Sequence, residues 1–271
     1  ALTDPLVRCM EREVAHGASL LRLVVEDLNA VAAFCRGDAK PTNELRALVD
    51  DFQRMRTPRP WSRGYEAPPS CQVIDAWMHD LRARLLQLQE LHQLMTTEPR
   101  ELPRSDFWMG GLFHPGAFIT ATRQFSAQTL GVALDELVLA VALDMDGGAS
   151  GRPASDGTSD QRVEFRVKGL AIEGATCQAG DLVVSDSSQI RVPAATFYWT
   201  TLQALESTGA TSSAAATSSG RELLEMPLYL NDSRTDMLAV VELPRSADVR
   251  AASFYQRAAA LIAWNGEPEA M

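Results

Sequence analysis

The hydrophobic and polar positions of residues 1–130 follow a helical period. Between Leu6 and Cys35 the apolar residues step by three or four positions, which predicts one helix with a single apolar stripe. Asp4 is placed to cap its first turn, Pro5 suits its first position, and Gly37 follows its end. The stripe consists of Leu6, Met10, Val14, Ala18, Leu21, Val25, Leu28, Ala32 and Cys35.

Three further helices are predicted before residue 134. Residues 42–55 form one that ends at the prolines of segment 57–60, which forbid continuation. Another is capped by Ser70 and carries its apolar stripe from Ile74 to Leu91, and the last spans residues 115–130 and ends at Gly131. The helix after Ser70 is expected to present a solvated or partner-facing surface made of Asp80, Arg82, Arg84, Gln87, Glu90 and Gln93.

From Leu134 the period changes from 3.6 to 2, because short apolar runs and alternating positions replace the helical spacing. The expected strands are residues 137–143, 163–167, 169–175, 181–184, 196–202, 227–230, 237–243 and 258–264. Short strands joined by turns favour an antiparallel sandwich or small barrel over a parallel sheet, so the fold class is α+β. Stretches near 147–160 and 207–220 are rich in Gly, Ser and Ala and are expected to be exposed, mobile loops.

The composition argues against several classes of protein. A net charge of −10 lacks the basic footprint of a nucleic-acid binder. The longest apolar run, residues 137–143, is too short to span a bilayer, so no membrane insertion is expected. The cysteines stand singly without a zinc or disulfide pattern, which indicates a reducing, intracellular setting. Because the chain starts with neither an initiator Met nor a signal-peptide pattern, we interpret it as a fragment of a longer protein.

The sequence carries no motif for catalysis or cofactor binding. Gly111 and Gly116 have the spacing of a phosphate-binding loop, but Ala117 stands where that loop has lysine. The histidines lack metal-site spacing, and the acidic turn after residue 144 has Ser155 where a calcium loop requires glutamate. We therefore expect this segment to contain no catalytic, cofactor-binding or metal-binding residues. A stand-alone module whose small barrel binds a ligand or a peptide is the alternative to a structural role.

Residues 107–121, with the sequence FWMGGLFHPGAFITA, mark the change from helices to strands. Adjacent glycines allow the backbone to turn sharply and to pass close to a neighbouring element, and a proline presets the first turn of the next helix. Aromatic residues beside a helix start are more often core than ligand pocket. We interpret the segment as a structural hinge whose principal residues are Trp108, Gly110, Gly111, Phe113, Pro115 and Phe118.

The hinge resembles the pattern W-L-S-G-F-F-x-P-x-x-F-L-T-A in the C-terminal region of dynein heavy chains. Residues 58–61 and 77–81 resemble that family's V-P-x-x-W and W-V-x-D-L, while residues 167–175 and 226–229 resemble its G-L-x-x-E-G-A and M/L-P-V-Y strands. The chain is therefore identified as a member of this family, and residues 112–124 are most similar to cytoplasmic dynein 2. The barrel motif of the family maps onto Gly169, Leu170, Glu173, Gly174, Pro227 and Tyr229.

The resemblance implies a helical segment, residues 1–133, that braces an AAA+ ring, and a small antiparallel β-barrel cap, residues 134–271. Its implied role is to modulate the ATPase-driven motion of a minus-end-directed microtubule motor, for dynein 2 in retrograde intraflagellar transport. ATP or ADP with Mg²⁺, and the microtubule, would bind other parts of the parent heavy chain. Expected partners are the ring modules of the same polypeptide and, in the full complex, dynein light and intermediate chains. The expected location is the cytoplasm and cytoskeleton, including a cilium or flagellum.

Overall fold

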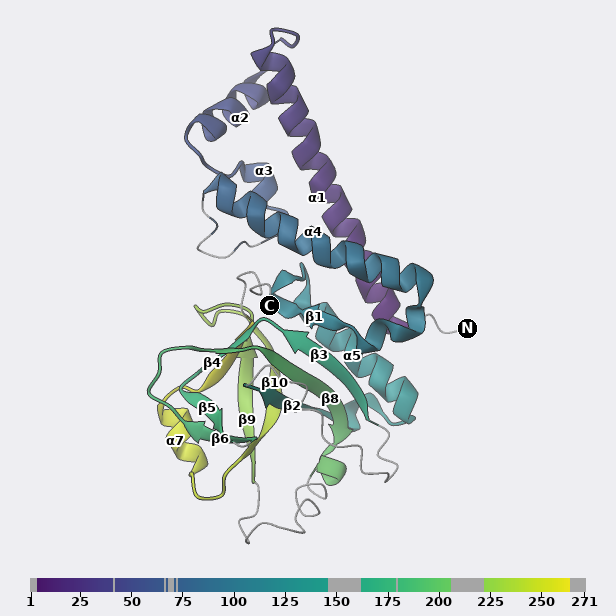
Figure 1. Ribbon diagram of the computed structural model, residues 1–271, viewed down its shortest axis with the longest axis vertical. Helices are drawn as coiled ribbons and strands as arrows, with labels where there is room; N and C mark the ends of the chain where they lie inside the picture. Colours follow the sequence, from purple (N-terminus) through teal and green to yellow (C-terminus); the bar gives the residue numbers. More distant parts are fainter. Residues whose placement is uncertain are drawn as a thin grey trace.

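The computed structural model describes residues 4–40, 42–65, 67, 71, 73–145, 162–178, 180–205 and 222–263. A group of helices projects from a body built on a β-sheet, and one further helix lies between the two parts (Figure 1). Both predicted mobile loops, near 147–160 and 207–220, fall outside the described residues.

The first helix, α1, spans Pro5–Cys35 as predicted. Its cap is Asp4, whose Oδ1 accepts hydrogen bonds from the backbone N–H groups of Leu6 at 2.8 Å and Val7 at 3.3 Å. These bonds satisfy amides that have no partner inside the helix. Gly37, with φ of 82°, turns the chain away after the last residue.

The remaining helices of the projecting part are α2 (Asn43–Gln53), α3 (Arg59–Ser62) and α4 (Ile74–Thr97). Thr42 caps α2 by accepting a hydrogen bond from the Leu45 N–H, and the helix lies within the predicted range 42–55. Ser70 lies outside the described residues and is not the cap of α4, because Val73 holds that position without a side-chain hydrogen bond. The cap of α4 therefore lies three residues later than predicted, and the helix begins at Ile74.

A short strand precedes the hinge, within the stretch predicted to be helical. The chain passes from α4 through the 3₁₀-helix η2 (Pro99–Arg104) to β1 (Asp106–Trp108), and then through the 3₁₀-turn η3 (Met109–Gly111) to α5 (Pro115–Leu130). As predicted, α5 starts with Pro115 and ends at Gly131, which adopts a left-handed φ of 69°. Because β1 joins the sheet, the division of the chain at residue 133 stays a prediction.

The sheet contains eleven strands among the described residues. After the turn η4 (Leu134–Glu136), they are β2 (Leu137–Asp144), β3 (Val163–Lys168), β4 (Leu170–Glu173), β5 (Ala175–Gln178), β6 (Asp181–Val184), β7 (Ile190–Val192), β8 (Ala194–Thr201), β9 (Glu222–Tyr229), β10 (Met237–Arg245) and β11 (Ala260–Ala263), with the short helix α7 (Ala251–Gln256) before the last.

The strand order is β1-β3-β8-β2-β10-β9-β11-β4-β7, with β6 pairing β10 and β5 pairing β6. Four pairs are parallel: β1 with β3, β2 with β10, β6 with β10, and β9 with β11. The prediction of an antiparallel sheet is therefore wrong for these pairs, because distant segments insert between neighbouring hairpin strands. No pairing between described residues joins β1 to β7, so a closed small barrel is not confirmed.

The main core lies between the sheet, α5 and the first half of α1. A smaller core fills the space between the outer half of α1 and helices α3 and α4, and consists of Leu20, Val24, Trp61, Tyr65, Trp77 and Leu81. None of the described helices is both long and apolar enough to cross a membrane. Within the same described ranges, no group of three or more His, Cys, Asp or Glu side chains is placed to hold a metal ion.

The outer half of α1 buries a different face from the predicted one. Leu20 and Val24 are 5% and 1% exposed and pack into the smaller core. Leu21, Val25 and Leu28, which continue the predicted apolar stripe, are 43%, 46% and 40% exposed. The predicted stripe is therefore wrong beyond the middle of the helix, because α3 and α4 approach the adjacent face and leave this one uncovered.

Candidate functional site: the joint between the helices and the sheet

The joint, residues 107–118, is held by side chains from α1 and α4. The first of these is Gln87 of α4, whose side-chain amide binds the backbone of Trp108 at both ends. Its Oε1 accepts from the Trp108 N–H at 2.6 Å, and its Nε2 donates to the Trp108 carbonyl at 3.2 Å. Gln87 thus satisfies the strand edge that β3, on the other side of β1, leaves open.

The second contact is a buried ion pair on α4 that reaches the joint. Arg84 donates through Nε to Asp80 Oδ2 at 2.8 Å and through Nη1 to the Leu112 carbonyl at 3.1 Å. Tyr65 donates its hydroxyl to the same carboxylate at 2.7 Å, and its ring centroid lies 4.5 Å from the guanidinium carbon. Burial first, and then the Asp80 charge, raise the pKa of Tyr65, so its hydroxyl stays protonated as the donor.

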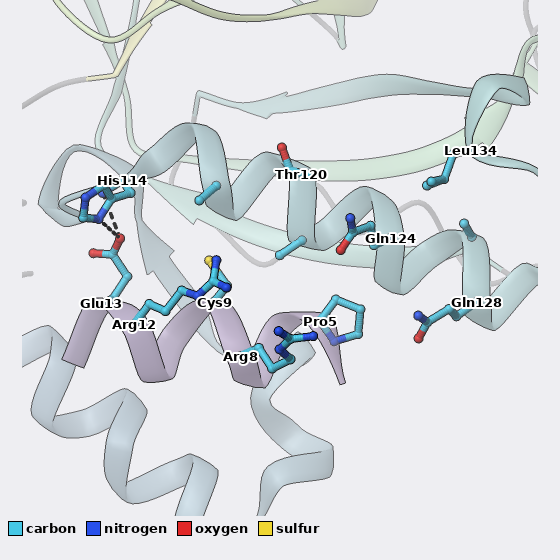
Figure 2. Close-up of a pocket in the computed structure, with 13 residues that line it drawn as sticks. Pro5, Arg8, Cys9, Arg12, Glu13, His114, Thr120, Gln124, Gln128 and Leu134 are labelled. Atoms are coloured by element: carbon cyan, nitrogen blue, oxygen red, sulfur yellow. Dashed lines mark hydrogen bonds and ion pairs between the residues drawn. The ribbon is translucent and has the colours of Figure 1, made fainter. Parts of the chain in front are cut away.

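The third contact is made by Glu13 of α1, which is 1% exposed. Its Oε2 accepts from the Phe113 N–H at 2.6 Å, and its Oε1 accepts from the N–H of His114 at 2.8 Å and from the Nδ1 of that imidazole at 3.1 Å. Figure 2 shows the carboxylate reaching from α1 to His114 at the start of α5. One buried carboxylate therefore ties two elements that are 100 residues apart in sequence.

Gly111 is required where the joint turns. A Cβ atom at this position would lie 2.1 Å from Cε3 of Trp108, because the indole ring packs directly against the glycine. Gly110 is buried in the same 3₁₀-turn, and Pro115 occupies the first position of α5. The sequence interpretation of a sharp backbone turn describes this geometry.

The aromatic residues of the joint face two different cores. Phe118 contacts Phe107 of β1, with ring centroids 4.7 Å apart, and Phe165 of β3 at 6.5 Å, which places it between α5 and the sheet. Phe113 faces the helical part instead, with its ring centroid 5.3 Å from that of Tyr65. The joint therefore inserts one aromatic side chain on each side, so that neither part can shift without moving it.

The residues of the predicted barrel motif lie in the sheet. Gly169 and Gly174 both adopt φ of 69° at the two ends of β4, and a Cβ atom on Gly174 would lie 2.7 Å from a backbone oxygen. Leu170 is buried at the start of the same strand. At its other end Glu173 pairs with Arg234, whose guanidinium also lies 6.0 Å from the Tyr229 ring centroid. Pro227 sits in β9 opposite Val240.

The α1–α5 groove, of about 920 Å³, lies beside the joint and outside the sheet (Figure 2). Its lining comes from the first half of α1, from α5 with the residue before it, and from the first residue of η4: Pro5, Arg8, Cys9, Arg12, Glu13, His114, Ala117, Thr120, Ala121, Gln124, Ala127, Gln128 and Leu134. Burial first, and then the Glu13 charge, raise the pKa of the Cys9 thiol to about 12. At neutral pH this thiol is protonated and therefore a poor nucleophile.

Sequence reasoning misses the side chains that hold the joint. Asp80 and Arg84, predicted to lie on a solvated or partner-facing surface, are 6% and 2% exposed, and Gln87 is half-buried against Trp108. The signal is their spacing of four and three residues, which places them on one helical face next to the apolar stripe. Glu13 likewise lies on the buried face of α1, where the other buried residues are apolar or glycine.

A family model for the C-terminal domain of dynein heavy chains matches residues 1–263. The chain belongs to this family. The resemblance found in the sequence is therefore confirmed, and the joint formed by residues 107–118 is a feature of a dynein C-terminal domain.

The relatives of this dynein domain are whole heavy chains. The cytoplasmic dynein heavy chain of Drosophila melanogaster is 35% identical over 263 residues, which cover 96% of the present sequence. That of Dictyostelium discoideum is 29% identical over 98% of the sequence, and the cytoplasmic dynein 2 heavy chain 1 of Chlamydomonas reinhardtii is 26% identical over 89%. The present chain spans about 5% of the length of these relatives.

Proposed function

We propose that this domain braces the AAA+ ring of a dynein heavy chain and modulates the ring's ATPase-driven motion. In this role it contributes no catalytic group and no cofactor, and ATP hydrolysis and microtubule binding belong to other parts of the same polypeptide. Light and intermediate chains join the full complex. Family membership supports the assignment to a motor, and the uncovered stripe of α1 supports docking.

The observation that carries this proposal is the apolar stripe formed by Leu21, Val25 and Leu28. These side chains follow one another at steps of four and three, so they lie on one face of α1. Each is exposed by 40% or more although the adjacent face of the helix is already buried in the smaller core. A helix that is apolar on two sides is normally covered on both. Covering the stripe contributes about 1 kcal/mol per residue.

The joint gives the brace its mechanical effect. The half of α1 that carries the stripe projects from the body, while Glu13 in its other half binds the start of α5 (Figure 1). Displacement of the ring surface against the stripe is then passed through the joint into the sheet. The small barrel cap implied by the family resemblance would be the part that receives this motion.

The relatives support proposals about location and subtype. A cytoplasmic, cytoskeleton-associated location is supported by the relatives named as cytoplasmic heavy chains. Transport toward microtubule minus ends is what the family resemblance implies. The cytoplasmic dynein 2 relatives support the finer proposal of retrograde intraflagellar transport in a cilium or flagellum. Localisation of the tagged full heavy chain separates the two: enrichment along cilia favours the second, and its absence there contradicts it.

The test uses the full heavy chain with Leu21, Val25 and Leu28 all replaced by serine. If the stripe docks on the ring, microtubule-stimulated ATPase activity and gliding velocity change together, in the direction seen when the whole domain is deleted. For a matched comparison, Val25→Ser alone is set against Val240→Ser on β10, since the two valines are 46% and 48% exposed.

Two results would overturn the proposal. One is a heavy chain without this domain that keeps its normal ATPase activity and velocity. The other is an isolated domain that hydrolyses ATP by itself, since a brace has no use for its own active site.

A further inference from the structure

The α1–α5 groove contains two positive charges that form no ion pair with any described residue. Arg8 and Arg12 line it one helical turn apart, both exposed, and neither forms an ion pair or a hydrogen bond with another described residue. The carboxylate of the groove, Glu13, is already bound to the N–H groups of Phe113 and His114. Two free guanidinium groups thus face a groove in a chain whose net charge is −10.

The opposite wall offers polar groups at the same spacing. Gln124 and Gln128 line the groove from α5 one helical turn apart, on the wall opposite the two arginines (Figure 2). Between the walls, the lining includes the small, buried side chains of Ala121 and Ala127. Small side chains here allow another backbone to approach closely, and polar walls then fix its orientation.

The groove is elongated, which favours a segment of polypeptide over a compact ion. Its lining runs from Pro5 to Glu13 along α1, about 12 Å at 1.5 Å per residue, and from His114 to Gln128 along α5, about 21 Å. The two arginines are offset by about 6 Å along α1. Acidic residues four apart in a helix, or two apart in an extended chain, repeat at nearly that distance.

We propose that the α1–α5 groove binds an acidic segment of the same heavy chain, with two carboxylates about 6 Å apart against Arg8 and Arg12. The proposal rests on the proposed function, in which the domain docks on preceding modules of its own polypeptide. The family is a C-terminal domain, and this chain spans about 5% of its relatives, so in them nearly all of the polypeptide lies before such a domain.

An intramolecular source also suits the weak contacts that the groove offers. Exposed ion pairs are individually weak, and salt screens them. A tethered segment meets the groove at an effective concentration on the order of millimolar, so a modest affinity fills it. Pro5, at the point where the preceding chain enters α1, is itself part of the groove lining.

Zero-length crosslinking in the full heavy chain tests the proposal directly. Arg8→Lys and Arg12→Lys place primary amines in the groove, and a water-soluble carbodiimide joins an amine only to a carboxylate in contact with it. Mass spectrometry then identifies the acidic partner. The matched control is Arg82→Lys, also an exposed position, which lies on α4 outside the groove and has no ion pair among the described residues. A mixture of ¹⁵N-labelled and unlabelled protein distinguishes coupling within one polypeptide from coupling between two.

We expect coupling from position 8 or 12 to Asp or Glu residues before this domain, within one polypeptide, at a yield well above that of the control and falling as salt is added. Coupling only within the domain, to a second copy or to another protein, or a yield equal to the control, overturns the proposal. These outcomes are separate from those of the stripe variants. If the stripe variants change the ATPase activity but the groove lysines do not couple, the brace is retained and the acidic segment is rejected. If the groove lysines couple but the stripe variants leave the ATPase activity unchanged, the acidic segment is retained and the brace is rejected.

Discussion

Replacing Glu13 with alanine removes the acceptor that holds the start of α5 to α1. The carboxylate accepts two backbone N–H groups, at 2.6 Å and 2.8 Å, and an imidazole nitrogen at 3.1 Å. Hydrogen bonds to charged groups contribute about 1.5–3 kcal/mol each. Phe113 is half-buried and His114 is exposed, so water replaces part of what is lost. Counting the two backbone bonds with that discount, the free energy of unfolding falls by about 2–4 kcal/mol.

Urea unfolding of the 271-residue chain, followed by tryptophan fluorescence, measures this loss. The matched control is Glu11→Ala, because Glu11 is exposed on the same helix and should change stability by less than about 0.5 kcal/mol. Glu13→Gln keeps the side-chain volume but turns an NH₂ group toward one of the N–H donors, so most of the loss should persist. If Glu13→Ala behaves like the Glu11 control, or if glutamine fully replaces the carboxylate, the assigned role of Glu13 is refuted.

Three further predictions concern the joint and the groove. Gly111→Ala should destabilise the chain by about 1–3 kcal/mol because its Cβ overlaps the buried indole, whereas Gly116→Ala, whose Cβ has 3.9 Å to its nearest neighbour, should be neutral or slightly stabilising in thermal unfolding. Arg84→Ala should cost about 3–5 kcal/mol in urea unfolding, since it leaves a buried carboxylate without its partner; a loss below about 1 kcal/mol would contradict that account. In the folded chain at pH 8, iodoacetamide should label the exposed Cys35 well before Cys9, because the pKa of Cys9 is raised from 9.0 to about 12. Mass spectrometry measures the two labelling rates, and equal rates would contradict this prediction by showing that the groove thiol is accessible and reactive. Because the pKa of Cys9 is raised in the folded chain, the stability that its protonated thiol contributes is complete below pH 9. This stability is lost as the pH rises from about 9 to 12.

Helix boundaries are predictable because the signals that set them are local. Asp4 binds amides two and three residues ahead, Thr42 binds the amide three residues ahead, and Gly131 adopts the left-handed conformation that its missing side chain permits. Each depends on a few neighbouring residues only. The same argument places the start of α5 at Pro115.

The errors arise where long-range packing decides the outcome. The period of α1 indicates an apolar face but does not say which of two adjacent faces α3 and α4 cover, so it assigns Leu21 and Val25 to the wrong side. Parallel pairing of β1 with β3 brings a strand from the helical half into the sheet, a contact that no local pattern specifies. The family resemblance identifies the joint correctly in sequence without revealing what holds it.

The joint is stabilised by side chains of the neighbouring helices and not by its own residues alone. A segment that turns sharply between two parts cannot satisfy its backbone groups with helix or strand bonds alone. Here Gln87, Arg84 and Glu13 supply the missing partners from two helices, so the joint is ordered only when those helices are in place. Helices, joint and sheet should therefore unfold as one cooperative unit.

That cooperativity bears on how a brace would work. α1 is a single 31-residue helix of about 46 Å, without proline beyond its first residue, so a force at one end is transmitted along it and not absorbed by a kink. Its outer half carries the uncovered stripe, and its inner half carries Glu13 and the arginines of the α1–α5 groove. Docking and transmission thus use different residues of the same helix. Loosening the joint should weaken the transmission of force while the stripe still docks. A coupling element requires this separation between docking and transmission, whereas a simple anchor does not.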